Sequence, residues 1–176
     1  LPPGVYAGAA TEFDFGAMMP NGGELTGMIN WTFDGSGGSG AGLTNKLVLI
    51  GSQGDVNVYE GDDPSDPTVF KAVGRWYVGR VPIGHRFFSL YASDIAIVSE
   101  KGLNFMSELM RGDGFHGNPQ IASQINSELA VQVANTLDTR YWEIVYLPHE
   151  QLLVINLPEY NNENRQWAYE VNNKAF

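Results

Sequence analysis

The side chains best suited to bind a cation lie in one acidic loop, residues 60–68, EGDDPSDPT. Asp62, Asp63 and Asp66 could supply carboxylate oxygens to Ca²⁺, which takes about six to eight oxygen ligands. The spacing lacks the Asp-x-Asp-x-Asp-Gly pattern of a calcium loop, and Asp and Pro also form solvated turns. We therefore expect a turn here, with the three aspartates as the candidate metal site.

The other residues with catalytic side chains form no recognisable constellation. His85, His116 and His149 are far apart, each stands beside Gly or Pro, and no nucleophile elbow accompanies them. The 20 acidic residues allow too many pairs for any one of them to predict a glycosidase. The chain has no cysteine, which excludes disulfides, thiolate zinc sites and Cys nucleophiles. We expect no catalytic residue and no cofactor.

Charge and composition restrict the partners and the fold class. The 176 residues carry a net charge of −10, which repels phosphate backbones, so we expect no sequence-specific nucleic-acid partner. No apolar run approaches the roughly 18 residues of a membrane span, so we expect no membrane partner. The 21 glycines and 9 prolines favour a turn-rich β-protein over a helical one.

Short apolar or alternating stretches between turns predict the elements that would position these loops. The expected strands are 23–33, 46–50, 55–59, 68–79, 86–92, 93–99, 103–109 and three more within 143–171. Gly74 is a candidate β-bulge in the fourth of them. Residues 1–22 are expected as an extended N-terminal arm.

One helix is expected as an insertion at about residues 118–137. Asn118 is a plausible N-cap and Pro119 suits the first helical position. An apolar stripe follows at helical spacing, formed by Ile121, Ile125, Leu129 and Val133.

The strands recur in a repeated pattern. KLVLIGSQGDVNVYEG at 46–61 matches DIAIVSEKGLNFMSEL at 94–109: an apolar run, a polar turn with Gly, then alternation. A looser copy occupies 143–171, and copies that start roughly 50 residues apart are typical of β-propeller blades. Because a closed propeller needs about four to eight blades, we expect a partial propeller. Residues 1–176 would form a single β-rich domain of a larger chain, and a β-sandwich is the alternative.

Connecting loops are the expected partner contacts. The loops at 34–42, 60–67 and 111–118 supply the candidates Gly37, Ser39, Asp63, Pro64, Arg111 and Asp113. The loop at 34–42 lacks the following helix and the Lys of a phosphate-binding loop. The RGD sequence at 111–113 is interpreted as part of a Gly-rich connection. Trp31, Trp76, Tyr77 and Trp167 could stack on sugars, although large rings more often fill the core.

Residues 45–172 contain a series of short motifs, formed by Gly54, Val56, Val58, Tyr59, Gly61, Asp63 and Pro64, then Val78, Gly79, Pro82, Gly84 and Arg86, then Asp94 and Gly102, then Trp142, Tyr146, Pro148, Leu153, Asn156 and Pro158. In this combination the motifs resemble a family of tailed-bacteriophage structural proteins. The resemblance implies a β-propeller-like virion component, similar to tail hub or packaged-DNA stabilising proteins at the head–tail junction. Because the family continues past the unit with which this chain ends, a fragment or shortened homologue is expected.

The resemblance also implies a function and a location. Such proteins do no chemistry, assemble into rings or homo-oligomers and bind other virion proteins, within a virion assembled in the host cytoplasm. A carbohydrate-binding β-module for host attachment, with a glycan as partner, is the alternative.

Overall fold

The computed structural model describes residues 14–33, 44–61, 63–66, 68–111, 123–158 and 165–170. Within these ranges the chain is mainly β, and strands consecutive in sequence form three antiparallel sheets. The N-terminal sheet has the order β1-β2-β3-β4, the middle sheet β5-β6-β7 and the C-terminal sheet β10-β9-β8. The strands are β1 (Leu25–Phe33), β2 (Thr44–Gly51), β3 (Asp55–Glu60), β4 (Lys71–Tyr77), β5 (Phe88–Tyr91), β6 (Asp94–Ser99), β7 (Gly102–Phe105), β8 (Glu143–Leu147), β9 (Leu152–Asn156) and β10 (Gln166–Glu170).

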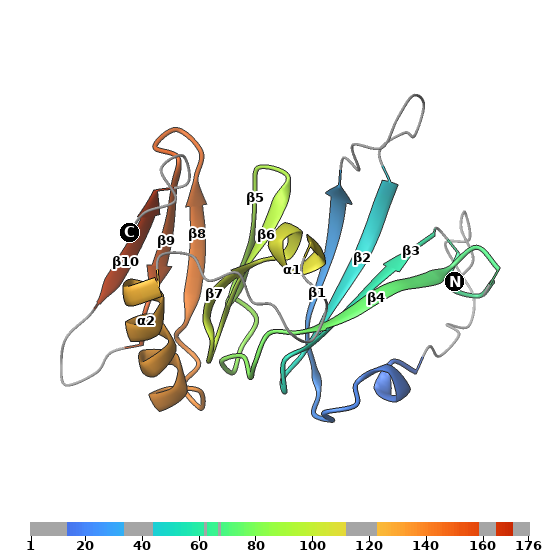
Figure 1. The fold of residues 1–176 in the computed structure, drawn as a ribbon, viewed down its shortest axis with the longest axis horizontal. Helices are drawn as coiled ribbons and strands as arrows, with labels where there is room; N and C mark the ends of the chain where they lie inside the picture. Colours follow the sequence, from blue (N-terminus) through green and yellow to red (C-terminus); the bar gives the residue numbers. More distant parts are fainter. Residues whose placement is uncertain are drawn as a thin grey trace.

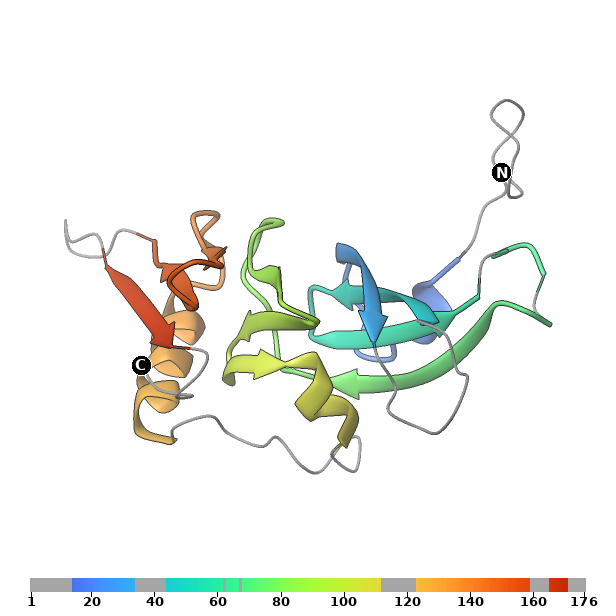
Figure 2. The ribbon, with the colours of Figure 1, turned by 90° about the horizontal axis from the view of Figure 1, so that it is seen from above.

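The sheets follow one another along the longest axis of the molecule, with the middle sheet between the other two (Figure 1). The helices α1 (Met106–Arg111) and α2 (Ser123–Asn135) lie on one side of this row (Figure 2). The mainly β class is therefore confirmed. The described ranges form an open row and not a closed ring, and face-to-face packing of sheets also fits the sandwich alternative.

Side-chain alternation along β6 explains how the sheets pack together. Ile95 and Ile97 belong to the core shared with the N-terminal sheet, whereas Ala96 and Val98 belong to the core shared with the C-terminal sheet. Successive strand residues point to opposite faces, so an uninterrupted apolar run can fill two cores at once. All six residues of β6 are buried.

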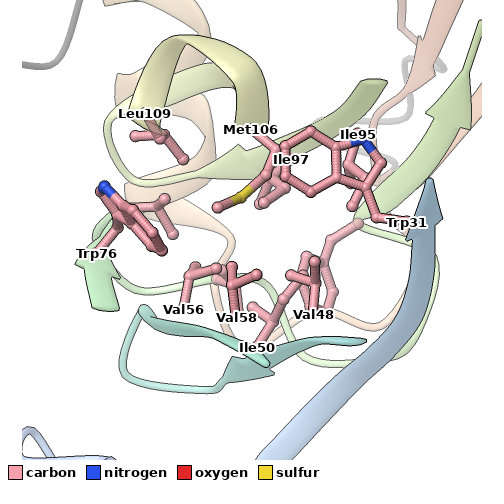
Figure 3. Packing of buried hydrophobic residues seen from close by; sticks show 13 residues of the cluster. Trp31, Val48, Ile50, Val56, Val58, Trp76, Ile95, Ile97, Met106 and Leu109 are labelled. Atoms are coloured by element: carbon pink, nitrogen blue, oxygen red, sulfur yellow. The ribbon is translucent and has the colours of Figure 1, made fainter. Parts of the chain in front are cut away.

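The first core joins the N-terminal and middle sheets (Figure 3). Trp31 is completely buried in it, and its indole Nε1 donates a hydrogen bond of 2.8 Å to the carbonyl oxygen of Ser93. Trp76 from β4 and Leu109 from α1 belong to the same core. The prediction that Trp31 and Trp76 serve the core is thus confirmed.

Helix α1 corrects the sequence prediction, which placed a strand over 103–109 and a single helix in the chain. The strand β7 ends at Phe105 and α1 begins at the next residue. The buried residues of α1, Met106 and Leu109, follow helical and not alternating spacing, and Asp94 Oδ1 accepts the Ser107 N–H at 2.9 Å. A carboxylate at the start of β6 therefore satisfies a helix N-terminal donor that local sequence cannot assign.

Helix α2 confirms the expected helix over its described part, and its Leu129 and Val133 are buried in the second core. Residues 118–122 lie outside the described ranges. This core also takes residues from the middle and C-terminal sheets. Helix α2 contacts β7 and β6 across it.

The expected repeat is present as comparable hairpins, β2–β3, β6–β7 and β8–β9. Gly54 and Gly102 occupy equivalent turn positions with φ of 91° and 95°, and Gln151 adopts φ of 55° in the third turn. Other boundaries are shorter than predicted. The strand expected over 68–79 extends only from Lys71 to Tyr77. Its pairing with β3 shifts register between Val58 and Tyr59, and Gly74 lies opposite Val58 at that shift. Of the N-terminal arm, the described part contains a 3-10 turn, Gly16–Met18.

Candidate interaction surfaces

The outer face of the C-terminal sheet carries partly exposed aliphatic side chains. Ile144, Leu153 and Ile155 point inward to the second core. The residues between them point outward, and Val145 and Leu147 are 36% and 37% exposed. Antiparallel sheets that face water usually carry polar residues on the wet side. In the part of the chain that the structure describes, this face therefore combines aliphatic side chains with polar ones and stays partly open.

Strand register arranges the outer face in rows. Val145 lies opposite Val154, which lies opposite Ala168, and these three form an aliphatic row. Leu147 and Leu152 extend it on the next row. We call these five residues the aliphatic strip. Neighbouring strands hold the strip as one continuous surface.

A polar row borders the aliphatic strip and is fixed by its own hydrogen bonds. Asn156 Nδ2 donates to Glu143 Oε2 at 3.0 Å, and Gln166 Nε2 donates to Asn156 Oδ1 at 2.8 Å. Arg86 donates to the other oxygen of Glu143 at 2.5 Å. These bonds order the polar row beside the strip.

The opposite end of the row, the outer face of the N-terminal sheet, is partly covered. The rings of Tyr59 and Phe70 stack with centroids 5.0 Å apart, and Phe15 meets Tyr59 edge-on at 5.8 Å. Leu49 is completely buried beneath this group, whereas Met28 at the edge is 63% exposed. The chain thus covers much of this face with its own residues.

A groove runs between α2 and the beginning of β10. Its deeper part is a pocket of about 90 Å³ lined by Gln132, Asn135, Thr136, Trp142, Leu157, Pro158 and Arg165. Its open part, about 390 Å³, is lined by Glu128, Gln132, Arg165, Gln166 and Trp167. Gln132 and Arg165 line both parts.

Two of the three aspartates in the candidate metal loop already accept hydrogen bonds from residues of the same loop. Asp63 Oδ1 accepts from Ser65 N and Oγ at 3.0 and 2.6 Å, and Asp66 Oδ1 accepts from Thr68 N and Oγ1 at 2.8 and 2.6 Å. The bonds from Thr68 hold the pKa of Asp66 below its ordinary value. In the part of the chain that the structure describes, no group of three His, Asp or Glu residues could hold a metal. Asp62 lies outside that part, so the full site stays a prediction.

The expected contact loops are described only in part. Pro64 and Arg111 are exposed, Asp63 is half-buried, and Gly37, Ser39 and Asp113 lie outside the described ranges. Arg111 is the last residue of α1. Of the described candidates, Asp63 and Pro64 lie in a loop and Arg111 lies at a helix end, and none belongs to the aliphatic strip.

Two of the histidines and two of the aromatic residues considered for chemistry are also placed. His85 Nδ1 lies 2.8 Å from the carbonyl oxygen of Thr26, and His149 is exposed. Tyr77 is half-buried with the Lys101 ammonium 4.4 Å above its ring, and Trp167 is half-buried beside the groove. The third histidine, His116, lies outside the described ranges.

The most strongly buried carboxylate that titrates unusually is Asp94. Burial raises its pKa above the ordinary value, although hydrogen bonds from Ser107 and Ile95 act in the opposite direction. Its contacts join the β5–β6 turn to α1, which is a structural role. Burial likewise raises the pKa of Tyr169 to about 12.

Sequence reasoning missed the aliphatic strip, although a signal for it exists. The runs EIVYL and LLVIN place apolar residues on both parities of β8 and β9. Only a strand covered on both faces needs this pattern, and here the described residues cover one face.

Comparison with known proteins gives no assignment, because no family model, curated protein or solved structure matches the chain. Among the described residues, no helix is both long and apolar enough to cross a membrane.

Proposed function

We propose that this protein is a non-enzymatic assembly module whose sheets continue to stack on sheets of neighbouring copies. The observation that carries the proposal is the aliphatic strip. Its residue types match those of the buried faces of β6, where packing between sheets already occurs within one chain.

Burial of apolar side chains would drive this association. Complete burial of a Val or Leu side chain is worth about 1.5–3 kcal/mol. The strip residues are already partly covered, so each contributes a fraction of that on binding. Together they provide the apolar centre of an interface, and the ordered polar row provides its rim.

In this proposal the sheets act as propeller-like blades. Each is a meander of neighbouring strands, and the middle one is covered on both faces by its neighbours. Repeated small sheets that hide one another's faces form arrays or rings. A ring-forming structural component of a phage or prophage virion, at the tail or head–tail junction, is the context that the sequence resemblance supports.

The test is a charge placed in the centre of the strip. Val154→Glu would bury a carboxylate against the neighbouring sheet, so we expect the variant to stay monomeric where the native chain self-associates. Val131→Glu is the matched control, because Val131 is 59% exposed on α2, away from the strip. Light scattering across a concentration series measures the mass of each, and circular dichroism checks the fold.

Two outcomes would contradict the proposal. One is a native chain that remains monomeric up to about 1 mM, the range of the weakest specific associations. The other is equal loss of self-association in both glutamate variants.

The carbohydrate-binding alternative has less support. Trp31 and Trp76 are buried, which leaves half-buried Tyr77 and Trp167 from the four aromatic residues considered. A glycan array with native chain would give specific hits on this alternative and none on the assembly proposal.

A further inference from the structure

Asn21 and Gly22 form the only Asn-Gly pair of the sequence, within PNGGE at 20–24. Asparagine is a thermolabile residue, and a glycine after it leaves the next backbone nitrogen without a hindering side chain. Both residues are exposed, and an added Cβ at Gly22 would have nothing within 4 Å. Solvent therefore has access to a pair of residues whose side-chain amide and backbone nitrogen can react with one another.

Hydrogen bonds occupy both of these groups in the folded chain. The Gly22 N–H donates to the carbonyl oxygen of Met19 at 2.9 Å. The Asn21 Nδ2 donates to Asp55 Oδ1 at 2.7 Å, and the Asn21 backbone N–H donates to Asp55 Oδ2 at 3.0 Å. The attacking nitrogen and the amide that it would attack are thus held by two different partners.

Asp55 is the fixed side of this contact. It is the first residue of β3 and is completely buried. Both of its carboxylate oxygens accept a hydrogen bond from Asn21. A buried carboxylate needs donors around it, and hydrogen bonds to a charged acceptor are stronger than neutral ones. Asp55 therefore holds Asn21 in place for as long as residue 21 remains an amide.

The contact anchors a segment that lies over the N-terminal sheet. Met19 is 7% exposed, and an added Cβ at Gly51 of β2 would lie 3.0 Å from its sulfur. Phe15, at the start of the segment, packs edge-on against Tyr59 of β3. Residues 15–21 are therefore fastened to the sheet at one end by an aromatic contact and at the other by the Asn21–Asp55 contact.

We propose that Asn21 is a latent deamidation site, which reacts when this segment lifts from Asp55. The freed Gly22 nitrogen bonds to the side-chain carbonyl carbon of Asn21, and the bond from that carbon to Nδ2 breaks. The Gly22 proton leaves with Nδ2 as ammonia, and a cyclic imide remains. Water then opens the imide to aspartate or isoaspartate, so solvent is the only co-reactant.

The product cannot restore the contact with Asp55. An aspartate at position 21 places a second carboxylate beside the buried one, and two carboxylates that share a site do not readily ionise together. Isoaspartate also lengthens the main chain by the side-chain methylene carbon. The modification therefore converts a reversible opening of the segment into a permanent one.

Mass spectrometry of the digested protein measures the reaction at mildly alkaline pH, because deamidation raises the mass of the fragment that contains Asn21. A synthetic peptide of residues 17–25 gives the rate without the fold. We expect the native chain to react at least about tenfold more slowly than this peptide, because only the locally opened form reacts.

Asp55→Ala separates local opening from unfolding of the whole chain. It removes both acceptors of Asn21, so we expect its deamidation rate to approach that of the peptide. Leu109→Ala is the control, because it should lower global stability through the first core and leave this contact intact. Its deamidation rate should stay near that of the native chain. Circular dichroism checks that both variants are folded.

Asn21→Asp tests the consequence of the reaction. We expect amide hydrogen exchange at residues 21 and 22, measured by NMR, to become at least about tenfold faster, because their hydrogen bonds in the folded chain are lost. Asn30→Asp, at an exposed residue of β1, is the matched control and should leave this exchange at the native rate.

Three results would overturn the proposal. They are equal deamidation rates in the native chain and the peptide, equal effects of Asp55→Ala and Leu109→Ala on the rate, and native amide exchange in Asn21→Asp. None of these measurements depends on self-association, which Val154→Glu tests separately.

Discussion

At the scale of single residues, the hairpin turns depend on one left-handed position each. Gly54 and Gly102 fill it in two turns, and Gln151 fills it in the third. A Cβ at Gly54 would stand 2.1 Å from the carbonyl oxygen of Gly79, so backbone conformation and space both demand glycine there.

Gly54→Ala is therefore expected to destabilise the chain by at least about 2 kcal/mol, from left-handed strain plus a backbone clash. Gly22→Ala is the matched control. Gly22 has φ of 72° with nothing within 4 Å of an added Cβ, so it tests strain without the clash. Urea denaturation measures both free energies of unfolding. Equal losses in the two variants would show that the clash is absent.

Asp94→Asn should change the pH dependence of stability. Because burial raises the pKa of Asp94 in the folded chain, its protonated form favours folding. That contribution is present below the unfolded pKa of about 3.8 and is lost as pH rises through the folded pKa. The native chain should thus lose free energy of unfolding relative to the variant as pH rises from 4 towards neutrality. Urea denaturation along this range measures it, and parallel profiles would contradict the expectation.

At the scale of elements, the short helix α1 packs in the core between the middle sheet and the N-terminal sheet. Leu109 is 3% exposed and shares the first core with Trp76 (Figure 3). The neighbouring Met110 is only partly buried. A six-residue helix has little stability by itself, so packing and the contact from Asp94 maintain it.

Leu109→Ala is expected to cost about 2–5 kcal/mol, since it leaves a cavity between the two sheets. Met110→Ala should cost clearly less, because that side chain packs at the margin of the same core. Thermal and urea unfolding compare the two. If both variants lose the same free energy of unfolding, Leu109 does not stabilise the packing between the two sheets.

At the scale of the whole molecule, packing is a row of sheets with unequal ends. The N-terminal end is only partly covered, by Phe15 and Phe70, and the C-terminal end presents the aliphatic strip. In our proposal a neighbouring copy packs on that strip. The Val154→Glu experiment tests this contact.

The sequence by itself determined the local elements. Alternation in DVNVY and the apolar runs KLVLI and DIAIVS predicted strands, and glycines 54 and 102 predicted turns, because both signals depend on neighbours within a few residues. The stripe through Leu129 and Val133 predicted α2 for the same reason.

Only the tertiary structure decided which faces are covered. Met106–Arg111 became a helix because its apolar side chains reach the first core and Asp94 accepts the Ser107 N–H, contacts that no local pattern contains. Among the described residues, β8, β9 and β10 pack one face on the second core and present the aliphatic strip on the other. The burial of a strand face depends on residues distant in sequence. A strand pattern alone therefore cannot predict which face of the strand is exposed to solvent.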